Sequence, residues 1–113
     1  MEPYSRAELI VSVDSIWSVC ERTMYAFEKC KIDNGNDPQA CLKYSVSVAG
    51  CTQKIMREIT KTCKPELDKA VHCVEENNMR TLKCTKETEE LFKCFKTNSF
   101  EKLVLLIIDL YKN

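Results

Sequence analysis

The sequence predicts an all-α protein built from two tandem, disulfide-stapled antiparallel helical hairpins and a C-terminal helix. Three observations lead to this fold class. All eight cysteines occur in four copies of the spacing Cys-x9-Cys. The positions of the copies are symmetrical within each half of the chain. The rest of the sequence is rich in helix formers and contains only two glycines and three prolines, so few residues interrupt a helix.

The cysteine spacing suits a pair of antiparallel helices. At about 100° per residue, ten positions carry a helix about 80° around its axis and about 15 Å along it, which keeps both thiols on one seam. Two antiparallel helices with equal cysteine spacings can therefore be joined twice. The four copies of the motif are Cys20/Cys30, Cys41/Cys51, Cys63/Cys73 and Cys84/Cys94.

Symmetry also predicts which cysteines pair among the roughly 105 possible connectivities. In each half, the outer two cysteines and the inner two share one midpoint. It lies between Gly35 and Asn36 in the first half and beside Asn78 in the second. Nested pairing therefore folds each half about its own turn. The predicted disulfides are Cys20–Cys51, Cys30–Cys41, Cys63–Cys94 and Cys73–Cys84.

The chain divides into four segments on this basis. They are an N-terminal helical lead-in (residues 1–15), a first hairpin (16–60), a second hairpin (61–98) and an apolar C-terminal helix (99–113). Ser5 and Glu8 have the spacing of a capping box, so a helix is expected to begin near Arg6 and to continue to about Lys31.

The first hairpin shows clear helical periodicity. Trp17 and Met24 flank its first seam and are candidates for a second contact face. Turn formers between Asp33 and Pro38 separate its two helices. Gly50 in the second helix either permits close approach of a neighbour or is merely tolerated. The first seam comprises Leu9, Val13, Ile16, Cys20, Thr23, Phe27 and Cys30, and the second comprises Cys41, Tyr44, Val48, Cys51 and Ile55.

The second hairpin begins after a break at residues 62–64. Pro65 suits the first turn of a helix that continues to about Glu76. A turn at residues 77–78 precedes a fourth helix at about 80–96. Leu67, Ala70 and Cys73 are expected to face inward on the third helix, whereas Glu87 occupies a seam position on the fourth. We therefore expect this hairpin to have the poorer core and to depend more on its disulfides.

The last segment is expected to bind a partner. Asn98 and Glu101 form a second possible capping box. The apolar run Leu103–Ile108 is far shorter than the ~20 residues that span a bilayer, yet it is apolar on nearly every side of a helix. Such a helix needs a covering surface. The expected partner-binding residues are Phe100, Leu103, Val104, Leu106, Ile107, Leu110 and Tyr111.

Composition restricts the compartment and the class of partner. Seventeen basic residues balance seventeen acidic ones and are spread along the chain, which gives no support to nucleic-acid binding. A disulfide framework requires an oxidising compartment. The N-terminus lacks the features of a secretory signal and is too acidic for a mitochondrial presequence. The mitochondrial intermembrane space is the remaining oxidising destination.

No catalytic or metal-binding pattern is recognisable. Structural zinc favours ligands two to four residues apart within a pair, and thiol oxidoreductases usually need a close Cys-x-x-Cys; neither is present. His72, the only histidine, is expected to be an ordinary surface or packing residue. The carboxylates Glu87, Glu89 and Glu90 are expected on a solvated helix face. We therefore expect no enzyme activity, cofactor or metal.

Several stretches resemble a known family. AFEKCK, NDPQACL, TCKPELDKAVHC and ETEELFKC, with RAELIVSVDSIWSVC before them, are similar to the coiled-coil-helix-coiled-coil-helix family of intermembrane-space proteins. The similarity is to its double-hairpin form, and within it to accessory subunits of mitochondrial complex I. It covers about residues 6–96, and the cysteine spacing is its most specific part.

The resemblance implies a non-catalytic subunit of respiratory complex I, peripheral on the intermembrane-space face of the inner membrane. Its partners would be other subunits of the membrane arm and, during import, the disulfide relay. The relay is expected to dock at Phe27 and Cys30, or at Cys51 and Ile55, where a cysteine and an apolar residue share a helix face.

Two other classes of protein compete with this interpretation. A soluble assembly factor or metallochaperone is expected to keep extra, reactive cysteines. A secreted eight-cysteine lipid-transfer protein normally shows adjacent Cys-Cys and Cys-x-Cys, which this sequence lacks.

Overall fold

The structure is a computed structural model that describes residues 3–99 in full and the backbone of Phe100. All regular secondary structure within this range is helical, which confirms the predicted all-α class. The elements are α1 (Arg6–Val11), α2 (Val13–Asp33), α3 (Leu42–Thr62), α4 (Lys64–Glu76), a 3-10 turn (Thr81–Cys84), α5 (Thr85–Phe95) and a π-helical turn (Lys96–Phe100).

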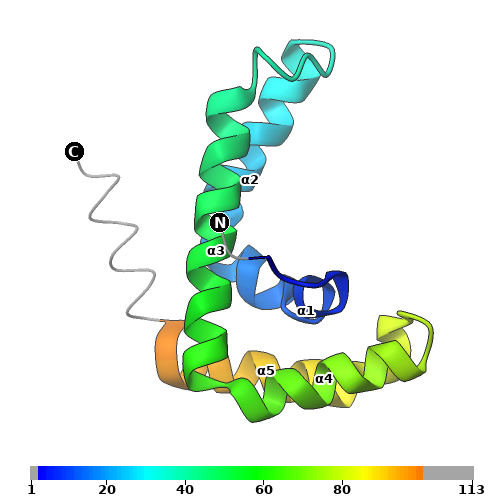
Figure 1. Cartoon of the computed structure of the whole chain (residues 1–113). Helices are drawn as coiled ribbons and strands as arrows, with labels where there is room; N and C mark the ends of the chain where they lie inside the picture. The colour runs from blue at the N-terminus through cyan, green and yellow to red at the C-terminus, as the bar shows by residue number, and fades with distance from the viewer. Residues whose placement is uncertain (1–2, 101–113) are drawn as a thin grey trace.

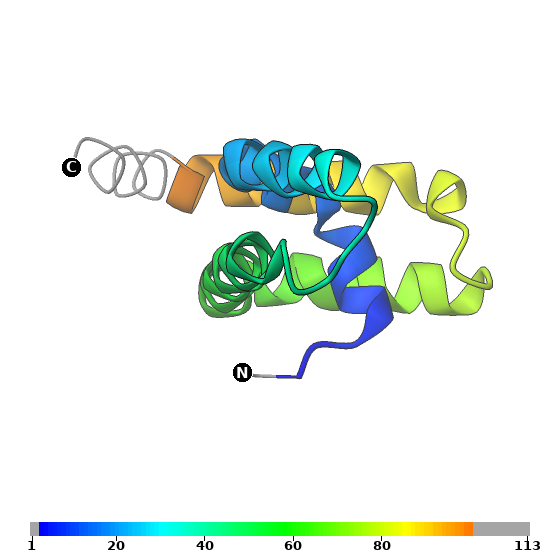
Figure 2. The same ribbon diagram turned by 90° about the horizontal axis from the view of Figure 1, so that it is seen from above.

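The helices form an L. The α2–α3 hairpin is the upright limb, and the α4–α5 hairpin crosses it at the base (Figure 1). Seen from above, α2 and α5 lie on one side of the molecule, α3 and α4 lie on the other, and α1 crosses between the two sides (Figure 2). A single residue, Cys63, connects α3 to α4. The base of the first hairpin is therefore in contact with the second hairpin.

The N-terminal helix is shorter than expected. The predicted capping box is present: the Glu8 backbone N–H donates to Ser5 Oγ (3.0 Å), and the Ser5 backbone N–H donates to Glu8 Oε1 (2.8 Å). The helix nevertheless ends at Val11, and α2 begins at Val13 after Ser12 (φ −98°, ψ 4°). The expectation of one continuous helix to Lys31 was wrong.

The break at Ser12 allows α1 to turn away from the axis of α2 and pack against α4. Ala7 and Val11 are thereby buried, and this burial outweighs the few hydrogen bonds lost at the break. The break also changes the helical phase. Val13, which was expected in the first seam, is exposed.

Both hairpins turn through the same backbone motif. In the first, Asn34 caps α2, Gly35 has a positive φ (61°), and the Asn36 N–H donates to the Lys31 carbonyl (2.9 Å). In the second, Asn77 caps α4, Asn78 has a positive φ (56°), and the N–H of residue 79 donates to the carbonyl of residue 74 (2.6 Å). This is the Schellman arrangement, which satisfies carbonyls left free at a helix end.

The hydrophobic core lies where α1, the base of the first hairpin and the second hairpin meet. The second hairpin contributes Leu67, Val74 and Phe95, all fully buried. Phe27 and Tyr44, in the first hairpin, are only half-buried. The core residues are Ala7, Val11, Ile16, Val19, Cys20, Ile55, Met56, Ile59, Cys63, Leu67, Ala70, Val74, Cys84, Leu91 and Phe95.

The expectation that the second hairpin has the poorer core was therefore wrong. That expectation considered only the two seams facing each other. In the structure α1 and the end of α3 also pack against α4, so side chains outside the seam become buried. The far end of the first hairpin, residues 25–48, receives no such cover from another helix of the described chain; we call it the outer arm.

The chain after α5 also differs from expectation. Lys96–Phe100 continues from α5 as a π-helical turn, and the Asn98 amide donates back to the Cys94 carbonyl (2.8 Å). Asn98 therefore lies inside this helical run instead of capping a new helix. Ser99 is buried, and its hydroxyl donates to the Glu58 carboxylate (3.1 Å) and lies 3.4 Å from the Thr62 hydroxyl. These contacts attach the turn to the end of α3.

Among the described residues, no helix combines the length and the apolar character needed to cross a membrane.

Candidate partner-binding surfaces and the disulfide framework

Four disulfides close the two hairpins, and they join the pairs that the shared midpoints predict. Each half contains an outer bond across 31 positions and an inner bond across 11. The Cα–Cα distances lie between 5.9 and 6.1 Å, within the usual range for a disulfide. No cysteine is free. The bonds are Cys20–Cys51, Cys30–Cys41, Cys63–Cys94 and Cys73–Cys84.

Three of the bonded cysteines are each followed, four positions later, by an asparagine. The side-chain amides of Asn34, Asn77 and Asn98 donate to the carbonyls of Cys30, Cys73 and Cys94, at 2.9, 2.8 and 2.8 Å. Each amide also lies against the sulfur of the same cysteine, at 3.5, 3.7 and 3.3 Å.

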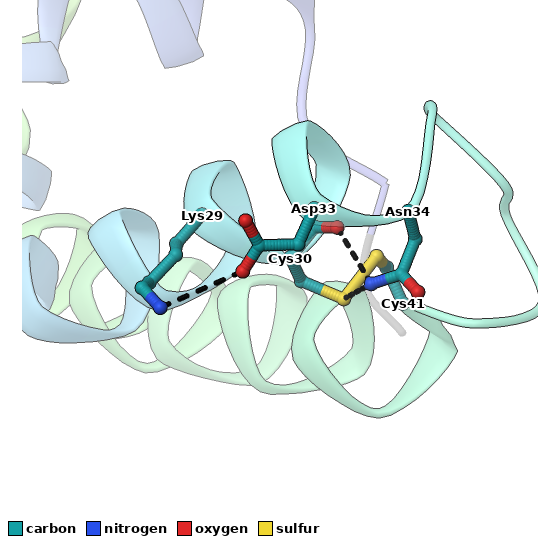
Figure 3. A network of polar contacts seen from close by, with 5 residues as sticks. All are labelled: Lys29, Cys30, Asp33, Asn34 and Cys41. Atoms are coloured by element: carbon teal, nitrogen blue, oxygen red, sulfur yellow. Dashed lines mark hydrogen bonds and ion pairs between the residues drawn. A yellow bond between two sulfur atoms is a disulfide. The ribbon is translucent and has the colours of Figure 1, made fainter.

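Figure 3 shows this arrangement at Cys30, with the Lys29–Asp33 ion pair beside it. Sequence reasoning missed the asparagines, although the repeated Cys-x3-Asn spacing was a usable signal. Each one supplies a hydrogen-bond donor to the last turn of a helix and covers one side of a disulfide.

Two groups of side chains in the described range resemble metal ligands in composition. They are Cys63, Glu66 and Cys94, and Cys73, Cys84 and Glu87. In both groups the two cysteines are joined in a disulfide. A sulfur in a disulfide is not the thiolate that zinc binds, so neither group fits a structural metal.

The remaining polar candidates lie on the surface of the second hairpin. His72 is exposed, and its Nε2 lies 3.0 Å from Glu76 Oε1 on the next turn of α4. Glu89 and Glu90 are exposed, and Glu87 is half-buried. Shallow hollows here are lined by charged side chains such as Lys86, Glu89, Glu90, Lys93 and Lys96. This surface is exposed and mixed in charge, unlike the mostly apolar clefts that bind small molecules.

Each of the two alternative pairs predicted to bind the import relay contains one buried and one half-buried residue in the folded chain. Ile55 has no exposed surface, and Cys51 beside it is half-buried. Phe27 is half-buried, and the Lys31 ammonium lies 4.7 Å from the centre of its ring. Cys30 is buried.

The partner-binding residues predicted at the C-terminus cannot be placed. The side chain of Phe100 and residues Leu103, Val104, Leu106, Ile107, Leu110 and Tyr111 lie outside the part of the chain that the structure describes in full. The described chain ends at the base of the L, where Ser99 is held against α3.

The structure reveals exposed apolar side chains elsewhere. On α2 they are Val13, Trp17, Tyr25 and Ile32. Sequence analysis singled out Trp17 as a second contact residue but not the other three. Trp17 flanks the disulfide seam, and Trp17, Tyr25 and Ile32 fall within about 80° of the helix circumference, which was the available signal.

The chain is similar to two subunits of NADH–ubiquinone oxidoreductases. It is 49% identical over 63 residues to NADH dehydrogenase [ubiquinone] 1 alpha subcomplex subunit 8 of Dictyostelium discoideum, covering 56% of this chain and 61% of that protein. It is 31% identical over 91 residues to the NADH-ubiquinone oxidoreductase 20.8 kDa subunit of Neurospora crassa, covering 80% and 50%.

A third relative is named for its cysteine motif. The chain is 39% identical over 41 residues to the mitochondrial Cx9C motif-containing protein 4 of Candida albicans, covering 36% of this chain and 49% of that protein. The four nested disulfides of the structure decide the architecture. The chain has a double twin Cys-x9-Cys fold.

This double twin Cys-x9-Cys chain spans about half to three-fifths of the length of the curated relatives it matches. No protein-family model matches it. The likeness to the Dictyostelium protein nevertheless confirms the resemblance drawn from the cysteine spacing and its flanking residues.

Proposed function

We propose that this protein is a non-catalytic accessory subunit of mitochondrial respiratory complex I, supporting assembly and stability of the membrane arm. The observation that carries the proposal is the 49% identity to alpha subcomplex subunit 8 of Dictyostelium. The architecture supports it, since every cysteine is committed to a structural bond.

The proposed location is the intermembrane space, peripheral on the inner membrane. The four disulfides support an oxidising compartment. The chain would acquire them from the disulfide relay during import, with docking at Phe27 and Cys30 or at Cys51 and Ile55. Docking precedes folding in this scheme, because Ile55 is fully buried once the hairpin has formed.

Attachment to the complex is proposed to use the segment after the π-helical turn. Residues 101–113 contain the run Leu103–Ile108, which a neighbouring subunit would cover. Burial of an apolar side chain contributes about 1.5–3 kcal/mol, more than an exposed ion pair supplies. The hydrogen bond from Ser99 to Glu58 supports this scheme, because it fixes the start of the segment at the end of α3.

The test is native electrophoresis of mitochondrial membranes, with mass spectrometry of the band that contains a tagged full-length chain. We expect co-migration with complex I. A second form, truncated after Phe100, keeps Ser99 and its contact with Glu58. This form should retain four disulfides in non-reducing peptide maps but should be largely lost from the complex. Stoichiometric recovery of the truncated form with complex I would show that the segment is not the anchor.

A second candidate is a soluble intermembrane-space assembly factor or chaperone for a respiratory complex. The similarity to a protein named only for its Cx9C motif and its mitochondrial location supports this second candidate. In that case the full-length chain would run as a small species in the same gel and would be absent from mature complex I. Such a result would overturn the proposal of a subunit.

A further inference from the structure

Much of one side of α2 is exposed, and Met24 on this side is half-buried against the core. At about 100° per residue, Val13, Trp17, Tyr25 and Ile32 lie within about 120° of the helix circumference, and the stripe is about 29 Å long. Their exposed fractions are 44%, 40%, 60% and 79%. The buried residues of α2 lie outside this sector: Ser15, Ile16, Val19, Cys20 and Cys30. Cys20 is only about 20° from Val13, so the apolar stripe lies beside the disulfide seam, and the rest of it faces away from the core.

Two aromatic rings on this side are packed against each other instead of against the core. The ring centroids of Trp17 and Tyr25 lie 5.6 Å apart with an interplanar angle of 64°, an edge-to-face contact that spans two helical turns. Both side chains remain exposed. Tryptophan and tyrosine often contribute most of the binding energy at protein interfaces, and rings that are already ordered lose less entropy on binding. This pair is therefore well suited to bind a polypeptide.

Carboxylates lie between the apolar residues. Asp14, Glu21 and Glu28 fall within the same 120° sector, and the sequence places them between Val13 and Ile32. Glu28 forms an ion pair with Lys31 (2.8 Å). Asp14 and Glu21 form no ion pair with any residue in the described range. Lys31 lies in the same sector, so the face carries three acidic residues and one basic residue and is both apolar and acidic. We call these seven residues, Val13, Asp14, Trp17, Glu21, Tyr25, Glu28 and Ile32, the outer stripe.

We infer that the outer stripe binds a basic amphipathic helix of another polypeptide. The apolar side of that helix covers the Trp17–Tyr25 pair, and its lysine or arginine residues lie beside Asp14 and Glu21. The complementarity of charge selects this occupant. The inference rests on α2 alone and does not depend on the assignment to complex I.

The same charges disfavour two other occupants. Anionic membrane surfaces attract basic segments, whereas the outer stripe carries Asp14, Glu21 and Glu28 and would be repelled. A second copy of this chain would bring two acidic stripes together, and like charges facing each other oppose association.

The test uses two labelled helical peptides, each about five turns long with one leucine stripe. Lysines flank the stripe in the first peptide, and glutamates replace them in the second. Fluorescence anisotropy with the full-length oxidised chain should show at least about tenfold tighter binding of the lysine-flanked peptide. Trp17→Ala should weaken that binding by about tenfold. The matched control is Leu82→Ala, a change at an 88% exposed residue of the second hairpin, which should leave binding unchanged.

Charge reversal separates binding from folding. Glu21→Lys should weaken binding of the lysine-flanked peptide and strengthen binding of the glutamate-flanked one, a reversal that an unfolded variant cannot produce. Equal binding of both peptides, or binding that Trp17→Ala does not alter, would overturn the inference.

Two further results would also overturn it. One is binding to vesicles of phosphatidylcholine and phosphatidylserine that Trp17→Ala abolishes, which would assign the stripe to a membrane surface. The other is a concentration-dependent dimer in sedimentation equilibrium that the same variant abolishes, which would assign it to a second copy.

Discussion

The α2–α3 and α4–α5 hairpins are closed by disulfides of the same spacing, and each turns through an asparagine-capped Schellman motif. Their interiors nevertheless differ. Leu67, Val74 and Phe95 are fully buried in the second hairpin, whereas Phe27 and Tyr44 in the outer arm of the first are only half-buried. The covalent framework is therefore the same in both halves, and the packing around it is not.

The difference follows from what lies beside each hairpin. α1 and the end of α3 pack against the second hairpin and exclude water from sides of α4 that its own partner helix cannot cover. Within residues 3–100 the outer arm has only two helices, and two helices in contact leave most of their circumference in solvent. Disulfides of the same spacing thus give two hairpins with the same helix pairing, but a third helix is needed to form a buried core.

The largest expected effect comes from the same substitution in the two hairpins. Phe95→Ala should lower the free energy of unfolding by about 3–5 kcal/mol, because it leaves a cavity in the packed core. Phe27→Ala should cost about 1–2 kcal/mol, because Phe27 is half-buried and water can occupy part of the space. Denaturant unfolding of the purified oxidised chain measures both. Equal losses would show that the outer arm is as well packed as the base.

The inner disulfides provide the next comparison, since both close 11 positions and should restrict the unfolded chain equally, by about 3 kcal/mol. Cys30→Ser with Cys41→Ser should open the outer arm locally. Cys73→Ser with Cys84→Ser should lower global stability while α4 and α5 stay protected by the core. Hydrogen exchange separates the two outcomes. If α4 and α5 of the second variant exchanged faster than the outer arm of the first variant, the second hairpin would be the less stable of the two.

A smaller effect is expected at the asparagine caps. Asn34→Ala and Asn77→Ala each remove a hydrogen bond to a cysteine carbonyl, which contributes about 1 kcal/mol. For Asn77 the loss should appear as a lower melting temperature of the whole domain, because this cap adjoins buried side chains. For Asn34 it should appear mainly as faster exchange near the turn. Identical hydrogen-exchange maps for the two variants would show that the outer arm does not open independently of the core.

The smallest effect is a gain in stability. Gly50 lies inside α3, and a Cβ added there would meet no atom within 4 Å, so the glycine is tolerated and does not permit a close contact among the described residues. Gly50→Ala should therefore raise stability by about 0.5–1 kcal/mol through helix propensity. We expect slower exchange in the outer arm with little change in α4. A loss of stability would indicate that the neighbourhood of Gly50 is more crowded than the structure shows.

Sequence alone determined the local and covalent features. The spacing of eight cysteines specifies two hairpins and the partners of each bond, because a helix repeats its direction at fixed intervals and two equal spacings match in only one antiparallel register. The Ser5–Glu8 capping box and the turns at residues 33–38 and 77–78 were also predictable, since each depends on residues close together in the chain.

The tertiary structure decided which surfaces are buried. The break at Ser12 and the exposure of Val13 accompany the packing of α1 against α4, a contact between segments more than 50 positions apart. Val74 and Phe95 are buried in the core where α1 and the two hairpins meet. No local sequence pattern shows which of these residues are buried, because an apolar residue occupies the same position in the pattern whether it contacts a third helix or water. The spacing of the outer stripe places its members on one side of α2, but it does not show whether another helix covers them. Trp17 and Tyr25 are large aromatic residues, and the arrangement of the helices leaves them exposed.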